Sequence, residues 1–306
     1  MRTHKISSAT AAALASAGLQ VKDVQRVIKE ALREDLGAGP DVTTQSTVPK
    51  DQRSRAVFAT RSAGCIAGID IAVAVLEMVC GQKNVLVEKK ASDADRVVPG
   101  QVLMHVTAPT RGLLTAERTA LNLLGHLSGI ASATRKWADA IAASGAQVRD
   151  TRKTTPGLRA LEKYAVRCGG GVNHRMSLSD AALVKDNHIV AAGGVAQAFA
   201  AVRAAAPKIA VEIEVDTLEQ LHVALGAGAD LVLLDNMPPP VLRDAVLIAE
   251  AHRATTGKSV ILEASGGLTL DNAADVAATG VRYISVGALT HSSSVLDIGL
   301  DMQAVV

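Results

Sequence analysis

Residues 209–235, IAVEIEVDTLEQLHVALGAGADLVLLD, contain the pattern that decides the fold. Two short runs rich in Val, Ile and Leu flank TLEQLHVALGAG, a segment that reads as a helix. A strand, a helix and a second strand in this order form a right-handed unit whose two strands are parallel. The stretch therefore predicts an α/β protein with a parallel sheet.

The same alternation runs from residue 146 to the last strand-like segment of the chain. The six strand-like runs are AQVRDT, ALVKDN, IAVEIEV, ADLVLLD, SVILEAS and RYISVG. The first gap also holds a long loop, and each later gap reads as a single helix. A complete barrel of this kind has eight strand–helix units in about 250 residues. We therefore expect an incomplete parallel α/β barrel over residues 118–290.

The segment before the barrel reads as a mixed α/β sandwich domain over residues 1–117, to which residues 291–306 could be joined. Residues 21–35 have helical spacing, with an apolar face formed by Val, Ile and Leu. Strand-like runs follow at 55–60, 85–88 and 102–107, and IDIAVAVLEMV reads as a helix between the first two. A long helical region from Thr115 to Ala143 is expected to be interrupted by Gly125 and Gly129.

The composition excludes several classes of protein. The net charge is +2 and aromatic residues make up only 2% of the chain, which argues against a nucleic-acid or membrane-surface partner. The three cysteines form no CxxC pair, so neither a disulfide framework nor a structural metal is expected. The Ala-rich N-terminus lacks a Leu-rich core, and no stretch has the length and apolarity of a membrane span, so we expect a cytoplasmic protein.

Each strand-like run ends on, or just before, a polar residue or a glycine. In chain order these residues are Arg152, Lys185, Glu214, Asp235, Ser265 and Gly287. Barrels of this type place their active sites at the carboxyl ends of the strands. The six residues are therefore expected to converge on one mouth.

Positive charge is concentrated between Thr151 and His188. Seven basic and three acidic residues give this segment a charge of +4. Three of the basic residues, Arg159, Lys163 and Arg167, recur at helical spacing and are expected on a solvated helix face. The other four lie at strand ends or in the Gly-rich loop, together with His174, and are Arg152, Lys153, Arg175 and Lys185. Arg and Lys gathered at one barrel mouth indicate a substrate with two or more negative groups.

Acidic residues face this cluster along the sequence. In VEIEVD, the acids Glu212, Glu214 and Asp216 alternate with apolar residues, and Glu214 is best placed near the strand end. Asp235 follows a wholly apolar strand, where it could be functional or could cap the next helix. Carboxylates beside anionic substrates usually hold sugar hydroxyls or a Mg²⁺ that bridges phosphates.

Glycine-rich turns follow the last two strands. Ser265, Gly266 and Gly267 end one strand, and Gly287 ends the next. Backbone N–H groups at such turns bind phosphate, and barrels often bind phosphate at their last two strands. Two other motifs are rejected: TTGKS at 255–259 lacks the first Gly of a P-loop, and GAGAD at 226–230 lacks the third Gly of a dinucleotide site. Cys168, near the Gly run, is read as a packed residue rather than a nucleophile.

Taken together, these motifs resemble the quinolinate phosphoribosyltransferase family along nearly the whole chain. The resemblance is carried by DTRKTTPGLRALEKYAVRCGGGVNHR, LVKDNHI, VEIEVD, LVLLDNM, LEASGGL and ISVGALTHS, and nearer the N-terminus by EDLGAGPDVTT and LLTAERTALNLLGHLSGIA. It implies transfer from phosphoribosyl pyrophosphate to quinolinate with Mg²⁺, giving nicotinate mononucleotide, pyrophosphate and CO₂. The fold it implies is the N-terminal α/β domain and incomplete barrel described above.

The resemblance also implies a role for each site residue. Quinolinate would be bound by Arg152, His174, Arg175 and Lys185, with Thr151 nearby. Lys153, Glu214 and Asp235 would be the catalytic residues that hold the ribose, the pyrophosphate and, through Glu214 and Asp235, the Mg²⁺. Ser265, Gly266, Gly267 and Gly287 would hold the 5′-phosphate. Arg118 would reach the site of a neighbouring subunit, which implies a homodimer or a higher even oligomer.

Two other functions compete with this interpretation. One is a related phosphoribosyltransferase of the same fold that acts on a different anionic substrate, such as nicotinate. The other is a sugar-phosphate-binding protein without catalysis, which would need the glycines but not Lys153, Glu214 and Asp235 together.

Overall fold

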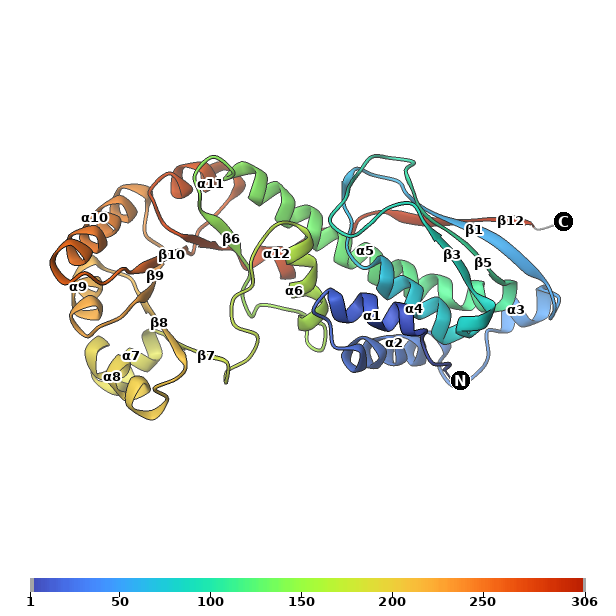
Figure 1. Cartoon of the computed structure of the whole chain (residues 1–306), viewed down its shortest axis with the longest axis horizontal. Helices are drawn as coiled ribbons and strands as arrows, with labels where there is room; N and C mark the ends of the chain where they lie inside the picture. Colours follow the sequence, from blue (N-terminus) through green and yellow to red (C-terminus); the bar gives the residue numbers. More distant parts are fainter. Residues whose placement is uncertain (1–2, 305–306) are drawn as a thin grey trace. The chain divides into compact units, whose positions relative to one another are not determined.

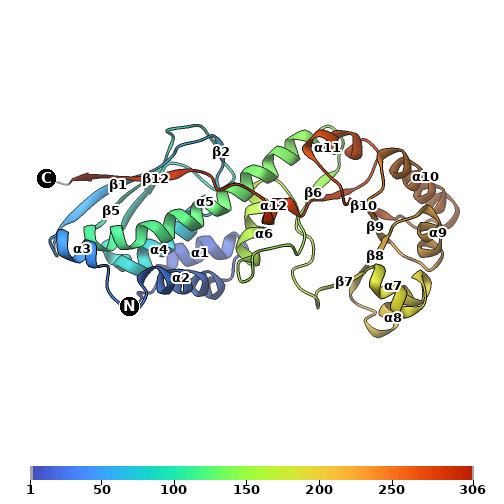
Figure 2. The same ribbon diagram turned by 180° about the vertical axis from the view of Figure 1, so that it is seen from behind.

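The computed structural model describes residues 3–304, which divide into two compact units (Figures 1 and 2). The first unit contains the described residues up to Arg135, Thr154–Gly170 and the residues from Thr290 onward. The second unit contains Lys136–Lys153 and Gly171–Leu289. The boundary expected between residues 117 and 118 falls inside α5 (Thr110–Ala140), a continuous helix. Residues 154–170, which the sequence assigned to the barrel, group with the first unit.

The first unit is a mixed α/β domain. Its helices are α1 (Ser8–Ser16), α2 (Val21–Leu36), α3 (Val42–Thr47), α4 (Ile69–Cys80), the N-terminal part of α5 and α6 (Arg159–Cys168), with a short 3₁₀ turn η1 (Gln82–Asn84). Its strands are β1 (Arg53–Thr60), β2 (Gly64–Cys65), β3 (Leu86–Lys89), β4 (Arg96–Val97), β5 (Val102–Pro109) and β12 (Ile298–Ala304). Four of these form an antiparallel sheet in the order β12-β1-β5-β3. Helices α1, α2 and α4 lie together on one side of it (Figure 1).

Hydrophobic periodicity explains why these elements form. Helix α2 buries Val24, Val27, Ile28 and Leu32, which share one face at helical spacing. Helix α4 is apolar all round and is buried along most of its length. Strand β1 buries Ala56 and Phe58 against the helices. The predicted helices and the three predicted strands, now β1, β3 and β5, are confirmed in this unit.

The expected interruption of the long helix is wrong. Gly125 and Gly129 lie inside the unbroken helix α5. A Cβ atom at Gly129 would collide with the carbonyl oxygen of Ser294, and one at Gly125 would lie 2.9 Å from the carbonyl oxygen of Leu296. These glycines therefore allow a chain segment to pass close to the helix.

The expectation of a solvated face on α6 is also only partly met. Arg167 is exposed. Lys163 lies four residues earlier on the same helix, yet it is fully buried. Glu162 is fully buried as well; its Oε1 lies 2.9 Å from Nε2 of His126, and its Oε2 accepts a hydrogen bond from the Thr155 amide. Helical spacing shows which residues share a face, but it does not show what covers that face.

The second unit contains the parallel sheet. Its strands are β6 (Gln147–Arg149), β7 (Ala181–Val184), β8 (Ala210–Val215), β9 (Leu231–Asp235), β10 (Ile261–Ser265) and β11 (Tyr283–Ser285). They pair in parallel in the order β6-β11-β10-β9-β8-β7. All six predicted strands are therefore present, and consecutive strands from β7 to β11 are neighbours. The sheet is an incomplete barrel, with β6 and β7 at its two ends.

Helices follow the strands along the chain. They are α7 (Asp186–Ala192), α8 (Val195–Ala205), α9 (Leu218–Gly226), α10 (Pro239–Thr256), α11 (Leu270–Ala277) and α12 (Ala288–His291). The segment between β7 and β8 holds two helices rather than the single one expected. Gly193 and Gly194, which both have positive φ, lie between them and end the first.

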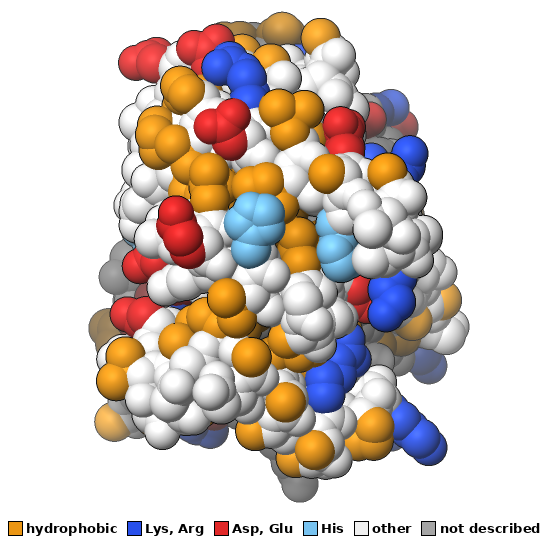
Figure 3. Space-filling model, turned by 90° about the vertical axis from the view of Figure 1, so that its left-hand side faces the viewer, with side chains coloured by type: hydrophobic (Ala, Val, Ile, Leu, Met, Phe, Trp, Pro, Cys, Tyr) orange, Lys and Arg blue, Asp and Glu red, His pale blue; other side chains and the backbone are white. Residues whose placement is uncertain are grey.

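A groove of about 530 Å³ lies between α9 and α10 on the outer surface of the second unit. Hydrophobic side chains and two histidines are visible on this end of the unit (Figure 3). The groove is lined by helix residues such as His222, Leu247 and His252. None of the strand-end residues lines it, so the chemistry must be sought elsewhere, at the carboxyl edge of the sheet.

Among the described residues, no single helix is long and apolar enough to cross a membrane. Helices α7 and α8 reach that length and composition only together, across a bend of 90°.

Candidate active site

The carboxyl edge of the parallel sheet gathers the residues that the sequence placed at strand ends. Ser265 and Asp235 are direct partners in the register of β10 and β9. Glu214 lies near the end of β8, and Lys185 follows the last residue of β7. Gly287 and Arg152 come shortly after β11 and β6. Because all six strands are parallel, these positions share one edge of the sheet.

Lys185 and Glu214 form an ion pair on this edge. The Nζ atom of Lys185 lies 2.6 Å from Oε2 of Glu214. The Lys185 side chain is half exposed, whereas that of Glu214 is 14% exposed. The resemblance assigned these two residues to different substrates.

Arg152 and Arg175 bring two positive charges close together. Burial and the nearby Arg152 guanidinium lower the pKa of Arg175 below its ordinary value. One guanidinium nitrogen of Arg175 donates a hydrogen bond to the carbonyl oxygen of Ala181, at 2.9 Å, which fixes the side chain at the start of β7. A ligand with two negative groups would relieve the repulsion between the two guanidinium groups.

The turn after β10 approaches the turn after β9 closely. The Asn236 amide donates to the carbonyl oxygen of Ser265, at 2.8 Å. Gly266 has φ +85°, and a Cβ atom there would collide with the Asn236 side chain. Only glycine fits this position, which leaves the backbone of the turn accessible for an anionic group.

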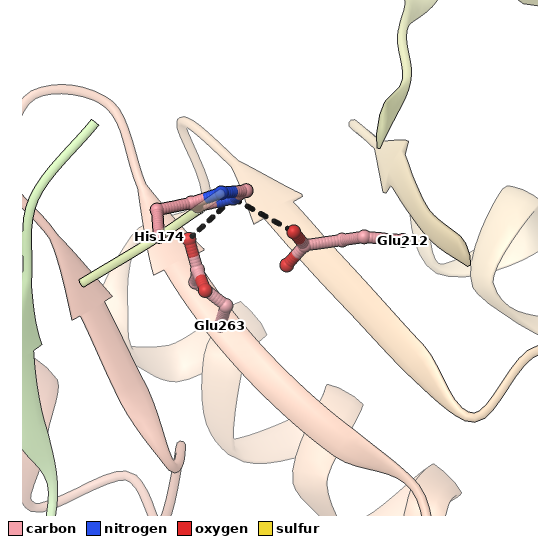
Figure 4. A group of neighbouring side chains, drawn as sticks. All are labelled: His174, Glu212 and Glu263. Atoms are coloured by element: carbon pink, nitrogen blue, oxygen red, sulfur yellow. Dashed lines mark ion pairs between the residues drawn. The ribbon is translucent and has the colours of Figure 1, made fainter. Parts of the chain in front are cut away.

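Beneath this edge lies a buried polar layer, shown in Figure 4. Glu212 and Glu263 are almost fully buried, and they point toward the imidazole of His174 (Figure 4). The Nε2 atom of His174 lies 2.8 Å from Oε2 of Glu212 and 3.9 Å from Oε1 of Glu263. Burial raises the pKa of both carboxyls above the ordinary value for glutamate.

The rest of the layer neutralises Glu263. Arg149 forms an ion pair with Oε2 of Glu263, and Ser285 donates a hydrogen bond to its Oε1. The Arg149 guanidinium also stacks over the ring of Tyr283, with 4.7 Å between the guanidinium carbon and the ring centroid. These contacts hold Arg149 and Glu263 in place below the strand ends.

The sequence interpretation did not single out this layer. Arg149 and Glu263 were not considered, and Glu212 was ranked below Glu214. A signal exists, because residues two positions apart on a strand share a face. Glu212 precedes Glu214 by two residues, Glu263 precedes Ser265 by two, and Arg149 precedes Thr151 by two. Recognising the layer requires knowing that three different strands bring these faces together.

The remaining site residues occupy more open positions. Thr151 accepts a hydrogen bond from the Lys153 amide, at 3.0 Å, and the Lys153 side chain is exposed. Arg118 is exposed on α5 in the first unit. It forms no hydrogen bond or ion pair with any residue in the described part of the chain. Cys168 is buried in α6, and burial raises the pKa of its thiol to about 12, which fits a packed residue.

Comparison with known proteins gives the same family along most of the chain. Residues 41–128 match the N-terminal domain of quinolinate phosphoribosyl transferase, and residues 130–301 match its C-terminal domain. The chain is 53% identical over 275 residues to the nicotinate-nucleotide pyrophosphorylase (carboxylating) of Mycobacterium leprae, covering 90% of this chain and 95% of that one. It is 40% identical over 280 residues to a probable nicotinate-nucleotide pyrophosphorylase (carboxylating) of Bacillus subtilis, with coverage of 91% and 93%.

Solved structures agree. The nicotinate-nucleotide pyrophosphorylase from Francisella tularensis superimposes with a TM-score of 0.86 at 38% identity, covering 93% of this chain and 98% of that chain. Human nicotinic acid phosphoribosyltransferase superimposes with a TM-score of 0.59 at 16% identity, a likeness that extends to the fold alone. The comparison therefore separates this chain from the nicotinate-using relative considered above.

The fold and the charged residues at the carboxyl edge of the parallel sheet define a phosphoribosyltransferase built on an incomplete α/β barrel. The models of both domains of one family match, and relatives at 40–53% identity are covered almost completely. The chain belongs to the quinolinate phosphoribosyltransferase family.

Proposed function

We propose that this chain transfers the phosphoribosyl group of phosphoribosyl pyrophosphate to the ring nitrogen of quinolinate, in the biosynthesis of NAD. The products are nicotinate mononucleotide, pyrophosphate and CO₂. The observation that carries the proposal is the set of charged residues, Arg152, Lys185, Glu214 and Asp235, at the carboxyl edge of the sheet. Quinolinate is a planar dianion, and the forked guanidinium group matches a carboxylate in two hydrogen bonds.

In this proposal the two substrates lie side by side on the edge of the sheet. Arg152, Arg175, His174 and Lys185 bind the quinolinate carboxylates, with Thr151 beside them. Lys153, Glu214 and Asp235 hold the ribose and the pyrophosphate. Ser265, Gly266, Gly267 and Gly287 hold the 5′-phosphate. The ion pair between Lys185 and Glu214 supports this arrangement because it joins a side chain proposed to bind quinolinate to one proposed to bind the ribose.

The chemistry requires positioning more than proton transfer. The bond from ribose to pyrophosphate breaks, and pyrophosphate leaves with the electron pair. Glu214 and Asp235 stabilise the positive charge that develops on the ribose, and the nitrogen lone pair of quinolinate forms the new bond. The pyridinium ring then takes the electron pair of the bond to the adjacent carboxylate. CO₂ leaves, and the ring carbon takes up a proton.

Mg²⁺ is the cofactor we propose. Glu214 and Asp235 fit it because they offer carboxylate oxygens at the ends of neighbouring strands, the ligands that Mg²⁺ takes together with substrate phosphates. When bound with the diphosphate, the ion supplies positive charge that neutralises the leaving group.

We further propose a homodimer, or a higher even oligomer, in which Arg118 enters the site of the partner subunit. The support is that Arg118 is an exposed arginine without a hydrogen-bond or ion-pair partner among the described residues. The proposed location is the cytoplasm, supported by the three buried cysteines, which are all free thiols.

The metal assignment is tested by replacing Asp235 with Asn. Loss of one charged ligand should raise the KM for phosphoribosyl pyrophosphate by about 10- to 100-fold and raise the Mg²⁺ concentration needed for half-maximal rate. Steady-state kinetics at varied Mg²⁺ measure both effects. Quinolinate binding, followed by calorimetry, should change little. Asp244→Asn on the outer helix α10 is the matched control. An unchanged Mg²⁺ dependence in D235N would remove Asp235 from the metal site.

A further inference from the structure

His174 contacts groups of the second unit through its backbone amide and through both nitrogens of its imidazole. The backbone amide of His174 donates to Oδ1 of Asp150, at 2.8 Å, and Asp150 is fully buried. The ring Nδ1 accepts a hydrogen bond from the Arg175 amide, at 2.7 Å. On its other side, Nε2 lies 2.8 Å from Oε2 of Glu212 (Figure 4). Because Nδ1 accepts a hydrogen bond, the neutral ring carries its proton on Nε2, the nitrogen that lies beside Glu212.

We propose that Glu212 is a positioning residue for quinolinate, acting through His174 on Arg175. Glu212 fixes the tautomer and the orientation of the imidazole. The imidazole in turn accepts the hydrogen bond from the Arg175 amide, and so sets where the Arg175 side chain begins. This inference rests on the proposed function of Arg175 as a quinolinate-binding residue.

Contacts within the buried layer single out Glu212 rather than Glu263. Glu263 is already engaged by Arg149 and Ser285. Oε1 of Glu212 has no hydrogen-bond partner within residues 3–304, and it lies 3.8 Å from an Arg149 nitrogen. Glu212 also lies closer to the imidazole of His174 than Glu263 does, at 2.8 Å against 3.9 Å. A buried carboxyl beside an imidazole can orient that ring.

A metal ion is the competing explanation for the same three side chains. Ligand atoms of His174, Glu212 and Glu263 all lie within 4.8 Å of one another. However, the Arg149 guanidinium already occupies one side of Glu263 and supplies the positive charge that a metal would bring. The imidazole Nε2 also carries a proton toward Glu212 in the tautomer derived above. The geometry therefore favours a protein network over a metal site.

Two substitutions at Glu212 separate orientation from charge. In Glu212→Ala the imidazole loses the carboxylate beside Nε2, and the KM for quinolinate should rise by about 10- to 100-fold, the range that follows removal of a residue that orients a ligand-binding side chain. The KM for phosphoribosyl pyrophosphate should change much less. In Glu212→Gln the amide oxygen can still accept from Nε2, so most of the quinolinate affinity should return. Glu219→Gln, an exposed residue on α9, removes the same charge without contact to the site and is the control.

The state of the ring can be read without any substrate. In ¹⁵N-histidine-labelled full-length protein, the His174 signals of the wild type should report a protonated Nε2 and an unprotonated Nδ1. E212Q should keep this pattern, and E212A should lose it. Equal KM values for quinolinate in wild type and E212A would overturn the proposal. So would an unchanged His174 pattern in E212A, or an E212Q variant as impaired as E212A in quinolinate binding.

This design also distinguishes the inference from the function on which it rests. If Arg175→Ala left quinolinate binding intact, the proposed function would fail whatever the His174 signals showed. If Arg175→Ala weakened binding but E212A did not, the function would stand and the positioning role of Glu212 would fall.

Discussion

Arg175→Ala should lower kcat/KM for quinolinate by about 30- to 1000-fold, with the larger part of the change in KM. An interaction between a partly buried cation and a charged ligand is worth about 2–4 kcal/mol when one partner is removed, which converts to this range. Arg175 is fixed by its hydrogen bond to the Ala181 carbonyl oxygen, and burial together with the neighbouring Arg152 lowers its pKa. The guanidinium group of Arg175 is therefore in position to bind an anion before the anion arrives.

Steady-state kinetics with each substrate varied in turn would measure this effect. The KM for phosphoribosyl pyrophosphate should stay near the wild-type value, because Arg175 lies on the quinolinate side of the site. Arg243→Ala on the exposed face of α10 makes the same chemical change away from the sheet edge, and should leave both constants unchanged. An equal loss of kcat/KM for both substrates would instead indicate damage to the fold.

Mixing two inactive variants should restore activity if the site is shared between subunits. Arg118→Ala and Arg175→Ala are each expected to be nearly inactive alone. In a mixed dimer, one site receives Arg118 from the R175A subunit and Arg175 from the R118A subunit, and is complete. Random exchange at equal amounts makes half of the dimers mixed, so about a quarter of the wild-type sites should return in a two-fold symmetric dimer.

The mixing experiment has a clear opposite outcome. If Arg118 served the site of its own chain, no mixed dimer would contain a complete site, and activity would not return. Sedimentation of the mixture, with one variant carrying a mass tag, shows whether mixed dimers formed. Failure to recover activity while mixed dimers are present would contradict a shared site.

The strand periodicity predicted the sheet edge well, because a short-range pattern determines it. Glu214, Asp235 and Ser265 lie at the ends of buried parallel strands, and the topology places every such end together. The approach of Gly266 to Asn236 agrees with the expectation that glycine is needed there. These features depend on local sequence and on one topological rule.

Features that depend on distant contacts could not be predicted in this way. Lys163 shares a helical face with Arg167, yet it is buried, because the cover of that face comes from elsewhere in the fold. Gly129 looked like a helix breaker until the close passage of Ser294 explained it. Glu263 and Arg149 meet across strands that are 114 residues apart in sequence. The proposed role of Arg118 depends on a second subunit, so only the family resemblance indicated it.

The most direct test of the central claim is the release of labelled CO₂ from quinolinate labelled in the carboxylate next to the ring nitrogen. The purified protein is incubated with this substrate, phosphoribosyl pyrophosphate and Mg²⁺. We predict that labelled CO₂ and nicotinate mononucleotide appear in equal amounts, and that neither appears without phosphoribosyl pyrophosphate. Formation of nicotinate mononucleotide from nicotinate, with no CO₂ released from quinolinate, would contradict the account.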